Sequence, residues 1–346
     1  MPEINPINGK IVVRINASSL VYSKCTKHWH LVIVDGYKEK VGKAAAIYGV
    51  AAHAYINTMF KTSGRIDLAR KDALAAFNVP KNDNRQQKYL SDEKHLLGTC
   101  FNLWDDWIEK EKDFDHLMIN SKCYWCDGEG KDSESGFVCT HCKGAGSTQQ
   151  PATEVTFSIL YYEDAFYEVW LEGTADKIGK IKNGCYAIGD YKTTSSSDDK
   201  EYLANYEMSA QLRFYVLSLK LMAEKYPDSI LGQIGATRIG AFIDGVFVRS
   251  NTVNNTYARS TVYIFKDEDL AEFRVLLDNA IQKLLTAMTL GTQYRREGIF
   301  NGACEPKFGS KCPFWFVCMS GSKEIEKLML ARDFKQKQYN PLKHND

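Results

Sequence analysis

Hydrophobic positions along the chain follow two different periods. Apolar residues recur at helical spacing in three segments, and each predicts a helix: residues 42–62, 200–226 and 269–289. Four other segments have the composition or alternation of strands: residues 11–20, 155–176, 230–250 and 260–266. The first of these strands runs into Ser18-Ser19, which we expect to cap the helix that follows. Residues 61–120 are mostly polar with helical spacing. The pattern therefore predicts a chain that combines a sheet with helices.

The strand pattern is most informative around one turn in the middle of the chain. The long first run ends on Asp176, and a short apolar run at residues 185–188 leads into Asp190 and Lys192. The Asn-Gly pair at 183–184 is typical of a hairpin turn. Alternation along the second strand puts Asp190 and Lys192 on the same side. We therefore expect two carboxylates and one ammonium group to meet at a strand end.

These three side chains suit one kind of chemistry. Paired carboxylates bind hard divalent cations, because Mg²⁺ prefers oxygen ligands and keeps several waters. A lysine beside such an ion can orient or deprotonate a water, or hold a phosphate oxygen. The alternative is a solvated hairpin with ordinary surface charges, since a bare D-x-K tripeptide is common.

Composition excludes some classes of protein. The chain has 346 residues, of which 44% are hydrophobic and 25% charged, with a formal net charge of +1. This is ordinary globular composition, so any nucleic-acid contact must come from a local basic face. The first residues do not resemble a signal peptide, and no apolar run is long enough to span a bilayer. We expect a soluble protein of the cytoplasm with no membrane partner.

Four of the ten cysteines form a repeated motif before the central strands. Residues 122–147 contain C-x-x-C-x-G-x-G twice, the pairing of a tetrahedral zinc site with four thiolates: Cys123, Cys126, Cys139 and Cys142. The glycines suit turns that aim backbone amides at sulfur. The repeat resembles the zinc-binding repeats of DnaJ chaperones, and His141 is then a bystander. A thioredoxin-like redox pair is the rival, but neither pair opens a helix after a strand.

The central hairpin resembles a known enzyme family. Its pattern is G-x-x-D, a glycine-containing turn, and an apolar run that ends in D-Y-K-T. This is similar to the core of the PD-(D/E)XK nuclease superfamily, especially its RecB-like branch. The resemblance extends from Ser18 to Cys318, with the zinc motif as an insertion. It implies an α/β fold with a mixed central sheet flanked by helices.

The resemblance also implies roles for residues outside the hairpin. The G-x-A-x-H motif at 49–53 resembles a helical motif of RecB-like nucleases in which the histidine, here His53, is a metal ligand; the alternative is a core histidine. Gln211 and Tyr215 share a helix face and resemble residues that line the site. RecB-like nucleases often carry a glutamate where Glu154 stands. For these three, a solvated or core-packing role is the alternative.

The implied reaction is metal-dependent hydrolysis of DNA phosphodiesters, most simply by an exonuclease. Mg²⁺ or Mn²⁺ would be bound by His53, Asp176, Asp190 and the backbone carbonyl of Tyr191, with Glu154 as a weaker candidate. Lys192 would position the attacking water or a phosphoryl oxygen, while Gln211 and Tyr215 would support the site.

A second set of cysteines lies near the other end of the chain, at Cys304, Cys312 and Cys318. In iron–sulfur nucleases of this kind, one N-terminal cysteine joins three near the C-terminus, and Cys25 stands where that residue is expected. The resemblance therefore implies a 4Fe–4S cluster. The C-x5-C pair matches, but seven residues instead of two separate Cys304 from Cys312, so a second zinc site is the rival.

The resemblance divides the chain into four parts. These are a helical N-terminal part of the nuclease domain (1–120), the zinc-binding insertion (121–148), the nuclease core with the C-terminal cysteines (149–320) and a peripheral tail (321–346). DNA is the expected partner, and a phage or mobile-element recombination enzyme would add a recombination or replication protein. A catalytically silent DNA-binding adaptor is the main alternative. A chaperone-like zinc module is another, but the rest of the DnaJ architecture is absent.

Overall fold

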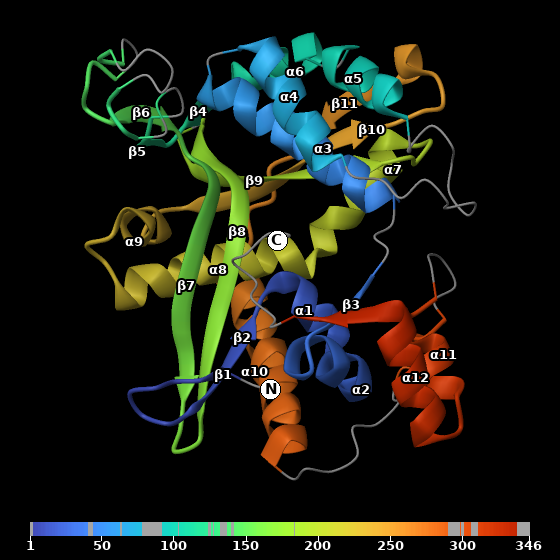
Figure 1. The fold of residues 1–346 in the computed structure, drawn as a ribbon. Coiled ribbons are helices and arrows are strands. Elements are labelled where there is room, and N and C mark those ends of the chain that lie inside the picture. The colour runs from blue at the N-terminus through green and yellow to red at the C-terminus, as the bar shows by residue number, and fades with distance from the viewer. Residues whose placement is uncertain are drawn as a thin grey trace.

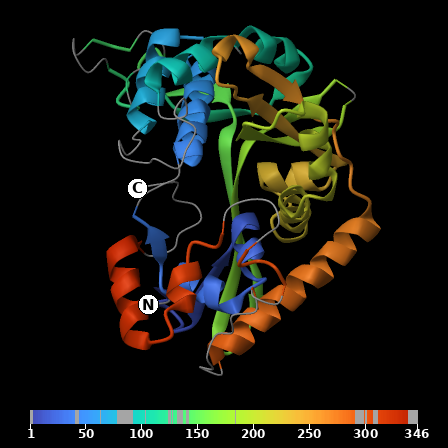
Figure 2. The same ribbon diagram turned by 90° about the vertical axis from the view of Figure 1, so that its right-hand side faces the viewer.

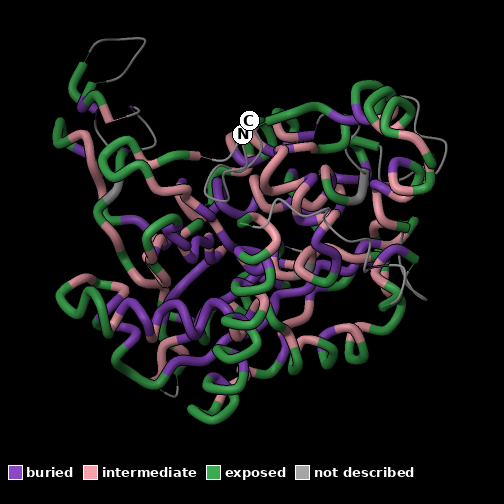
Figure 3. Tube along the Cα trace, turned by 90° about the horizontal axis from the view of Figure 1, so that it is seen from below, coloured by how far each residue is buried: buried purple, intermediate pink, exposed green. Residues whose placement is uncertain are grey.

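The structure is a computed structural model, and it describes residues 3–40, 44–62, 64–77, 92–102, 104–123, 126, 128–131, 137–139, 142–182, 184–289, 298, 301–305 and 311–337. A long twisted sheet runs through the molecule, and helices cover both of its faces (Figure 1). Buried segments fill the middle and exposed ones surround them (Figure 3). The expected α/β class is therefore confirmed.

Among the described residues the main sheet has the strand order β1-β2-β8-β9-β10-β11, with β4 and β7 also paired to β8. The strands are β1 (Glu3–Ile4), β2 (Ile11–Ile15), β4 (Phe114–His116), β7 (Thr153–Glu163), β8 (Tyr167–Ile181), β9 (Tyr186–Thr194), β10 (Ile239–Phe247) and β11 (Thr256–Arg259). The β2–β8 and β9–β10 pairs are parallel and the others antiparallel. The sheet is mixed, as the family resemblance implies.

Two hydrophobic clusters lie on opposite faces of this sheet. Alternate side chains of β10 divide between them, because Ile243 belongs to one cluster and Val246 to the other. The larger cluster packs α1 (Ala17–Tyr22), α8 (Ala210–Lys225) and α10 (Asp267–Thr289) against the long strands. The smaller one packs α3 (Ala44–Lys61), α4 (Ile66–Ala76), α5 (Glu93–Asn102) and α6 (Trp104–Glu111). In Figure 2, α3 to α6 (blue to teal) lie at the top of the view and α10 (orange) runs along the lower right.

The first long β-run is two strands, not one. A turn at Asp164 separates β7 from β8, where its carboxylate accepts hydrogen bonds from the backbone N–H groups of Phe166 and Tyr167. Asp176 does not end a strand, since β8 continues to Ile181 before the turn to β9. Gly184 has the positive φ of +86° that this turn requires. Asn183 lies outside the described residues.

Four other expected elements differ in the structure. The helix expected over 200–226 breaks into α7 (Asp199–Ala204), a 3₁₀ turn and α8, because the Ser209 side chain caps a new helix by accepting from the Leu212 N–H. Residues 230–250 begin with the short helix α9 (Ile230–Gly235) before β10. The 260–266 run contributes only a bridge between Tyr263 and Ala241. Similarly, residues 11–20 contain β2 and then α1, whose cap is Asn16 and not Ser18 or Ser19.

The two ends of the chain pack together. After α11 (Trp315–Met319) and α12 (Lys323–Asp333), strand β12 (Phe334–Gln336) pairs with β3 (Tyr37–Glu39). A separate hydrophobic cluster joins these segments: Leu31, Phe314, Val317, Leu330 and Phe334. The tail up to Lys337 is thus anchored, although the sequence suggested a peripheral segment. Among the described residues, no helix combines the length and the apolar character needed to cross a membrane.

Candidate active site

The central charged pair lies on β9. Lys192 Nζ lies 2.5 Å from Oδ2 of Asp190, on the side of the strand that the alternation predicts. The Gln211 amide on α8 donates to the other oxygen, Oδ1, over 2.9 Å. Burial lowers the pKa of Lys192, but attraction to Asp190, supported by Asp176, outweighs this effect and raises it. The ammonium group is therefore charged and held beside a carboxylate whose residue is only 3% exposed.

Asp176 faces this pair from the neighbouring strand. Its Oδ2 accepts a hydrogen bond of 2.6 Å from the backbone N–H of Tyr191. Its Oδ1 lies 3.9 Å from Nδ1 of His53 on α3, and the His53 ring meets the Tyr191 ring edge-on at 5.6 Å. Burial, together with the charge of Asp190 and against the attraction of His53, raises the pKa of Asp176 to about 6. Because the negative charges of Asp176 and Asp190 repel each other, the two carboxylates favour a cation between them.

Helix α8 supports the pair from the opposite side of the site. The Gln211 amide also donates to the Tyr215 hydroxyl over 2.9 Å, and that hydroxyl donates to the Thr174 carbonyl over 3.0 Å. Burial and the charges of the two aspartates raise the pKa of Tyr215 well above its ordinary value, so the hydroxyl keeps its proton. A chain of hydrogen bonds thus runs from β8 through α8 to Asp190.

Glu154 stands apart from the other expected site residues. It is exposed, has a positive φ of 53°, and its carboxylate lies 4.0 Å from Nζ of Lys61. The structure brings together His53, Asp176, Asp190, Lys192, Gln211 and Tyr215, but no contact draws the Glu154 carboxylate into that group. Glu154 is exposed like Thr156, whereas Thr153 and Phe157 are buried, so its side chain lies on the more exposed side of β7.

Sequence reasoning missed a buried ionic cluster next to the site. Lys177 is fully buried and pairs with Glu111 and, over 2.6 Å, with Asp244. Arg259 binds the same two carboxylates, and His116 lies 2.7 Å from Glu111. Lys177 Nζ also lies 4.8 Å from the centre of the Tyr191 ring. The one sequence signal was a charged residue within the apolar pattern of a strand buried on both faces.

The C-x-x-C repeat closes into one compact group. A small two-stranded sheet, β5 (Met118–Lys122) with β6 (Ser147–Pro151), carries it away from the main sheet. The four sulfurs lie within 4.8 Å of one another and are buried: Cys123, Cys126, Cys139 and Cys142. The Gly146 N–H points at the Cys142 sulfur over 3.3 Å. Burial raises the pKa of Cys142, but this N–H and the neighbouring thiols outweigh it and lower it to about 7. The group has the donors and size for one metal ion; His141 lies outside the described residues.

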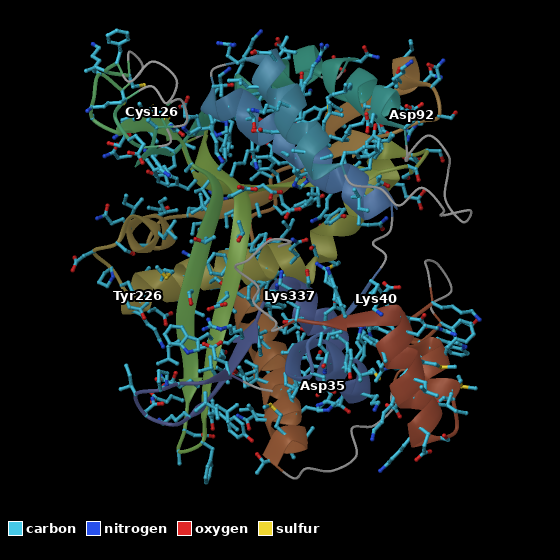
Figure 4. All side chains as sticks on the ribbon, viewed as in Figure 1. Asp35, Lys40, Asp92, Cys126, Tyr226 and Lys337 are labelled. Atoms are coloured by element: carbon cyan, nitrogen blue, oxygen red, sulfur yellow. The ribbon has the colours of Figure 1, made fainter. Side chains whose placement is uncertain are left out.

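The second cysteine set lies away from the first: Cys25 directly precedes α2 (Thr26–Trp29) and Cys318 lies on α11, both at the lower right of Figure 1, whereas Cys126 is labelled at the upper left of Figure 4. Cys25 lies near Cys304: a Cβ on Gly298 would come within 2.7 Å of the Cys304 sulfur and 3.4 Å of Cys25 Cβ. The Cys312 N–H donates to the Cys304 carbonyl over 2.9 Å. Burial, with the nearby thiols of this set adding, raises the pKa of Cys312 to about 12.

The sulfur atoms of this second set lie further apart than those of the first. Among the described residues, only the C-x-x-C repeat forms a group of three or more His, Cys, Asp or Glu ligand atoms within 4.8 Å. Thiolates on one tetrahedral zinc ion lie only about 4 Å apart, given a Zn–S bond of about 2.3 Å. The wider spacing does not match a second zinc site, but a cluster of several irons separates its thiolates further.

Comparison with known proteins identifies the family. A profile described as the PD-(D/E)XK nuclease superfamily matches residues 15–319. The chain belongs to the PD-(D/E)XK nuclease superfamily. In this PD-(D/E)XK protein, Asp190-Tyr191-Lys192 has the (D/E)-X-K spacing that names the family, and it lies opposite Asp176 in the structure.

Similarity of the PD-(D/E)XK chain to solved structures is distant. A "putative exonuclease" from Eubacterium rectale is 13% identical, with a TM-score of 0.42, over 89% of this chain and 93% of that one. The protein SSO0001 is also 13% identical, with a TM-score of 0.27, over 85% of this chain and 97% of that one. No curated protein matches the chain.

Proposed function

We propose that this protein is a Mg²⁺- or Mn²⁺-dependent deoxyribonuclease that hydrolyses phosphodiester bonds, acting as an exonuclease in DNA recombination, repair or processing. One observation carries the proposal. His53 lies 3.9 Å from Asp176, and the charge of Asp190 acts on Asp176, so side chains from α3, β8 and β9 offer metal ligands beside the charged Lys192. Their ligand atoms do not all lie within 4.8 Å of one another, so a bound ion would have to draw them closer. Membership of a nuclease superfamily supports the reaction class.

Each of these residues has a role that follows from its position. His53, Asp176, Asp190 and the Tyr191 carbonyl would hold the metal, which lowers the pKa of water and stabilises charge on the phosphate. Lys192 positions the attacking water or a phosphoryl oxygen, because its ammonium group stays charged beside Asp190. Gln211 and Tyr215 orient Asp190 through their hydrogen bonds. Glu154 is the weakest candidate, since it is exposed and its carboxylate lies 4.0 Å from Nζ of Lys61.

The direct test is digestion of defined DNAs. End-labelled linear DNA and covalently closed circular DNA are incubated with the purified protein and Mg²⁺ or Mn²⁺, and a chelator serves as the control. We expect loss of label from linear DNA and survival of the circle. Cleavage of the circle would replace the exonuclease assignment with an endonuclease. Binding without cleavage under either metal would favour the silent adaptor.

We also propose two accessory metal centres. Zinc fits the C-x-x-C group because its four buried sulfurs lie at single-ion spacing. An iron–sulfur cluster, most simply 4Fe–4S, fits Cys25, Cys304, Cys312 and Cys318: the other three thiols lie near enough to act on Cys312, but no three of the four sulfurs lie within 4.8 Å of one another. Neither centre takes part in the hydrolysis. The second would join the N-terminal and C-terminal segments that β3 and β12 already hold together.

A further inference from the structure

A histidine lies beside the second cysteine set, and neither the family motif nor the reaction accounts for it. Cys25 and His28 have the spacing C-x-x-H, and α2 begins directly after Cys25, so the two residues share one face of the turn. His28 Nδ1 lies 3.5 Å from the Cys312 sulfur, a residue almost at the other end of the chain. This distance is a hydrogen-bonding distance for sulfur.

Packing fixes the position of the His28 ring. Tyr22 stacks on it with ring centroids 4.5 Å apart and an interplanar angle of 25°. Phe314, two residues after Cys312, meets it edge-on at 5.3 Å. Helix α2 is itself held to α12 by an ion pair of 2.5 Å between Lys27 and Glu326. The nitrogen is thus aimed at the sulfur by aromatic neighbours from both ends of the chain.

The number of thiolates decides what this nitrogen can do. A 4Fe–4S cluster has one protein ligand per iron, and the four cysteines of the set already supply these. His28 is therefore a fifth group, next to a sulfur that is itself a ligand. A single ion held by His28 and the cysteines is disfavoured, because three such ligand atoms do not come within 4.8 Å of one another among the described residues there.

We propose that His28 donates an Nδ1–H hydrogen bond to the Cys312 thiolate and thereby raises the reduction potential of the cluster. The inference rests on the cluster proposed above. Reduction adds an electron to the cluster, and a hydrogen bond to a ligand sulfur stabilises the more negative state. Both the neutral and the protonated ring can carry the Nδ1 proton, so the effect does not depend on the titration of His28.

The test uses His28→Phe, which keeps an aromatic ring between Tyr22 and Phe314 but removes the donor. Protein is purified anaerobically, its iron per chain is measured, and the cluster is titrated with dithionite while absorbance and EPR are recorded. We expect unchanged iron content and a midpoint potential more negative than that of the wild type. The matched control is His30→Gln in the next turn, where the ring faces Asp35 at 3.3 Å; its potential should stay at the wild-type value.

Three results would overturn the inference. Loss of iron in His28→Phe would indicate that His28 is itself a ligand. An unchanged midpoint potential would show that the proposed hydrogen bond does not affect the cluster. Wild-type protein that contains no iron would rule out the proposed cluster. The nuclease assignment would still be tested separately, by DNA cleavage with Mg²⁺ or Mn²⁺. Pulsed EPR on reduced wild type with ¹⁵N-histidine needs no variant. A weakly coupled nitrogen supports the hydrogen bond, whereas strong coupling means ligation and no coupling means no contact.

Discussion

The backbone N–H of Tyr191 holds Oδ2 of Asp176 over 2.6 Å, while the side chains on either side of Tyr191 form the Asp190–Lys192 pair. One short stretch of β9 therefore positions three charged groups. The backbone fixes the first carboxylate, and alternation along the strand fixes the other two groups. This arrangement leads us to expect separable effects when the groups are changed one at a time.

Substitution of Asp190 and substitution of Lys192 should impair different properties of the enzyme. Asp190→Asn removes a negative charge from the metal site, so it should weaken Mg²⁺ or Mn²⁺ binding and abolish cleavage. Lys192→Ala leaves both carboxylates and should keep metal binding, but slow single-turnover cleavage on the order of 10²–10⁴-fold. Metal titration and cleavage of labelled DNA measure the two effects.

DNA binding serves as the control for both variants. It should survive each change, because most affinity comes from phosphate contacts spread along a groove. If cleavage is observed in the wild type and neither substitution slows it, this hairpin is not the active site.

The buried ionic cluster should make stability depend on pH. Burial raises the pKa of Glu111, but Lys177, His116 and Arg259 outweigh it and lower it from 4.5 to about 2. A depressed carboxyl pKa stabilises the fold above the unfolded value and loses this contribution as the pH falls from about 4.5 towards 2. Glu111→Gln should therefore cost about 3 kcal/mol at pH 7 and flatten the loss of stability in acid.

Urea unfolding of wild type and Glu111→Gln between pH 7 and pH 3 measures this difference. Glu109→Gln is a matched control on the same helix, since Glu109 is exposed and pairs only at the surface with Lys112. Equal acid sensitivity in wild type and Glu111→Gln would show that the cluster does not set this pH dependence.

Gly189 makes room for the buried lysine. A Cβ at this position would lie 2.6 Å from Lys177 Cε and 2.7 Å from Phe242 Cζ. Gly189→Ala should therefore reduce the free energy of unfolding by about 1–3 kcal/mol through overpacking. It should also reduce cleavage, because the strain falls next to Asp190. Gly49→Ala on α3 is the control: its Cβ would meet Thr193 only at an ordinary 3.7 Å, so stability should not fall. Equal thermal unfolding of the two variants would contradict the prediction.

The zinc module should be accessory to the chemistry. It stands on its own two-stranded sheet, whereas the catalytic candidates lie on the main sheet. Replacing residues 122–147 with a short Gly/Ser linker should leave cleavage of a short oligonucleotide measurable. Complete loss of cleavage in a variant with a normal circular dichroism spectrum would place the module in the active site.

The two cysteine sets should respond separately to substitution. Anaerobically purified wild type should be brown and contain about one zinc per chain. Cys312→Ser should remove the colour and keep the zinc, whereas Cys126→Ser should do the reverse, because the two sets lie away from each other in the molecule. Metal analysis and absorbance measure both. Colourless wild-type protein with two zinc ions would replace the cluster with the zinc alternative.

The local pattern of residue types in the sequence determined those features that depend on residues close together along the chain. Alternation placed Asp190 beside Lys192, the C-x-x-C repeat predicted one compact cysteine group, and helical spacing located α10 with an error of two residues at its start. The local sequence pattern was less reliable in predicting where helices and strands begin and end. The Ser209 helix cap and the Asp164 turn are both formed by side-chain hydrogen bonds. The pattern of hydrophobic positions carries no information about such bonds.

Only the tertiary structure decided which distant residues meet. The Lys177 cluster draws its carboxylates and Arg259 from segments far apart in the sequence, so no spacing could predict it. The same holds for His28 beside Cys312 and for Glu154 beside Lys61. Strand pairing and helix packing fix these contacts, because burying a charge requires a partner that only the folded chain can bring within reach.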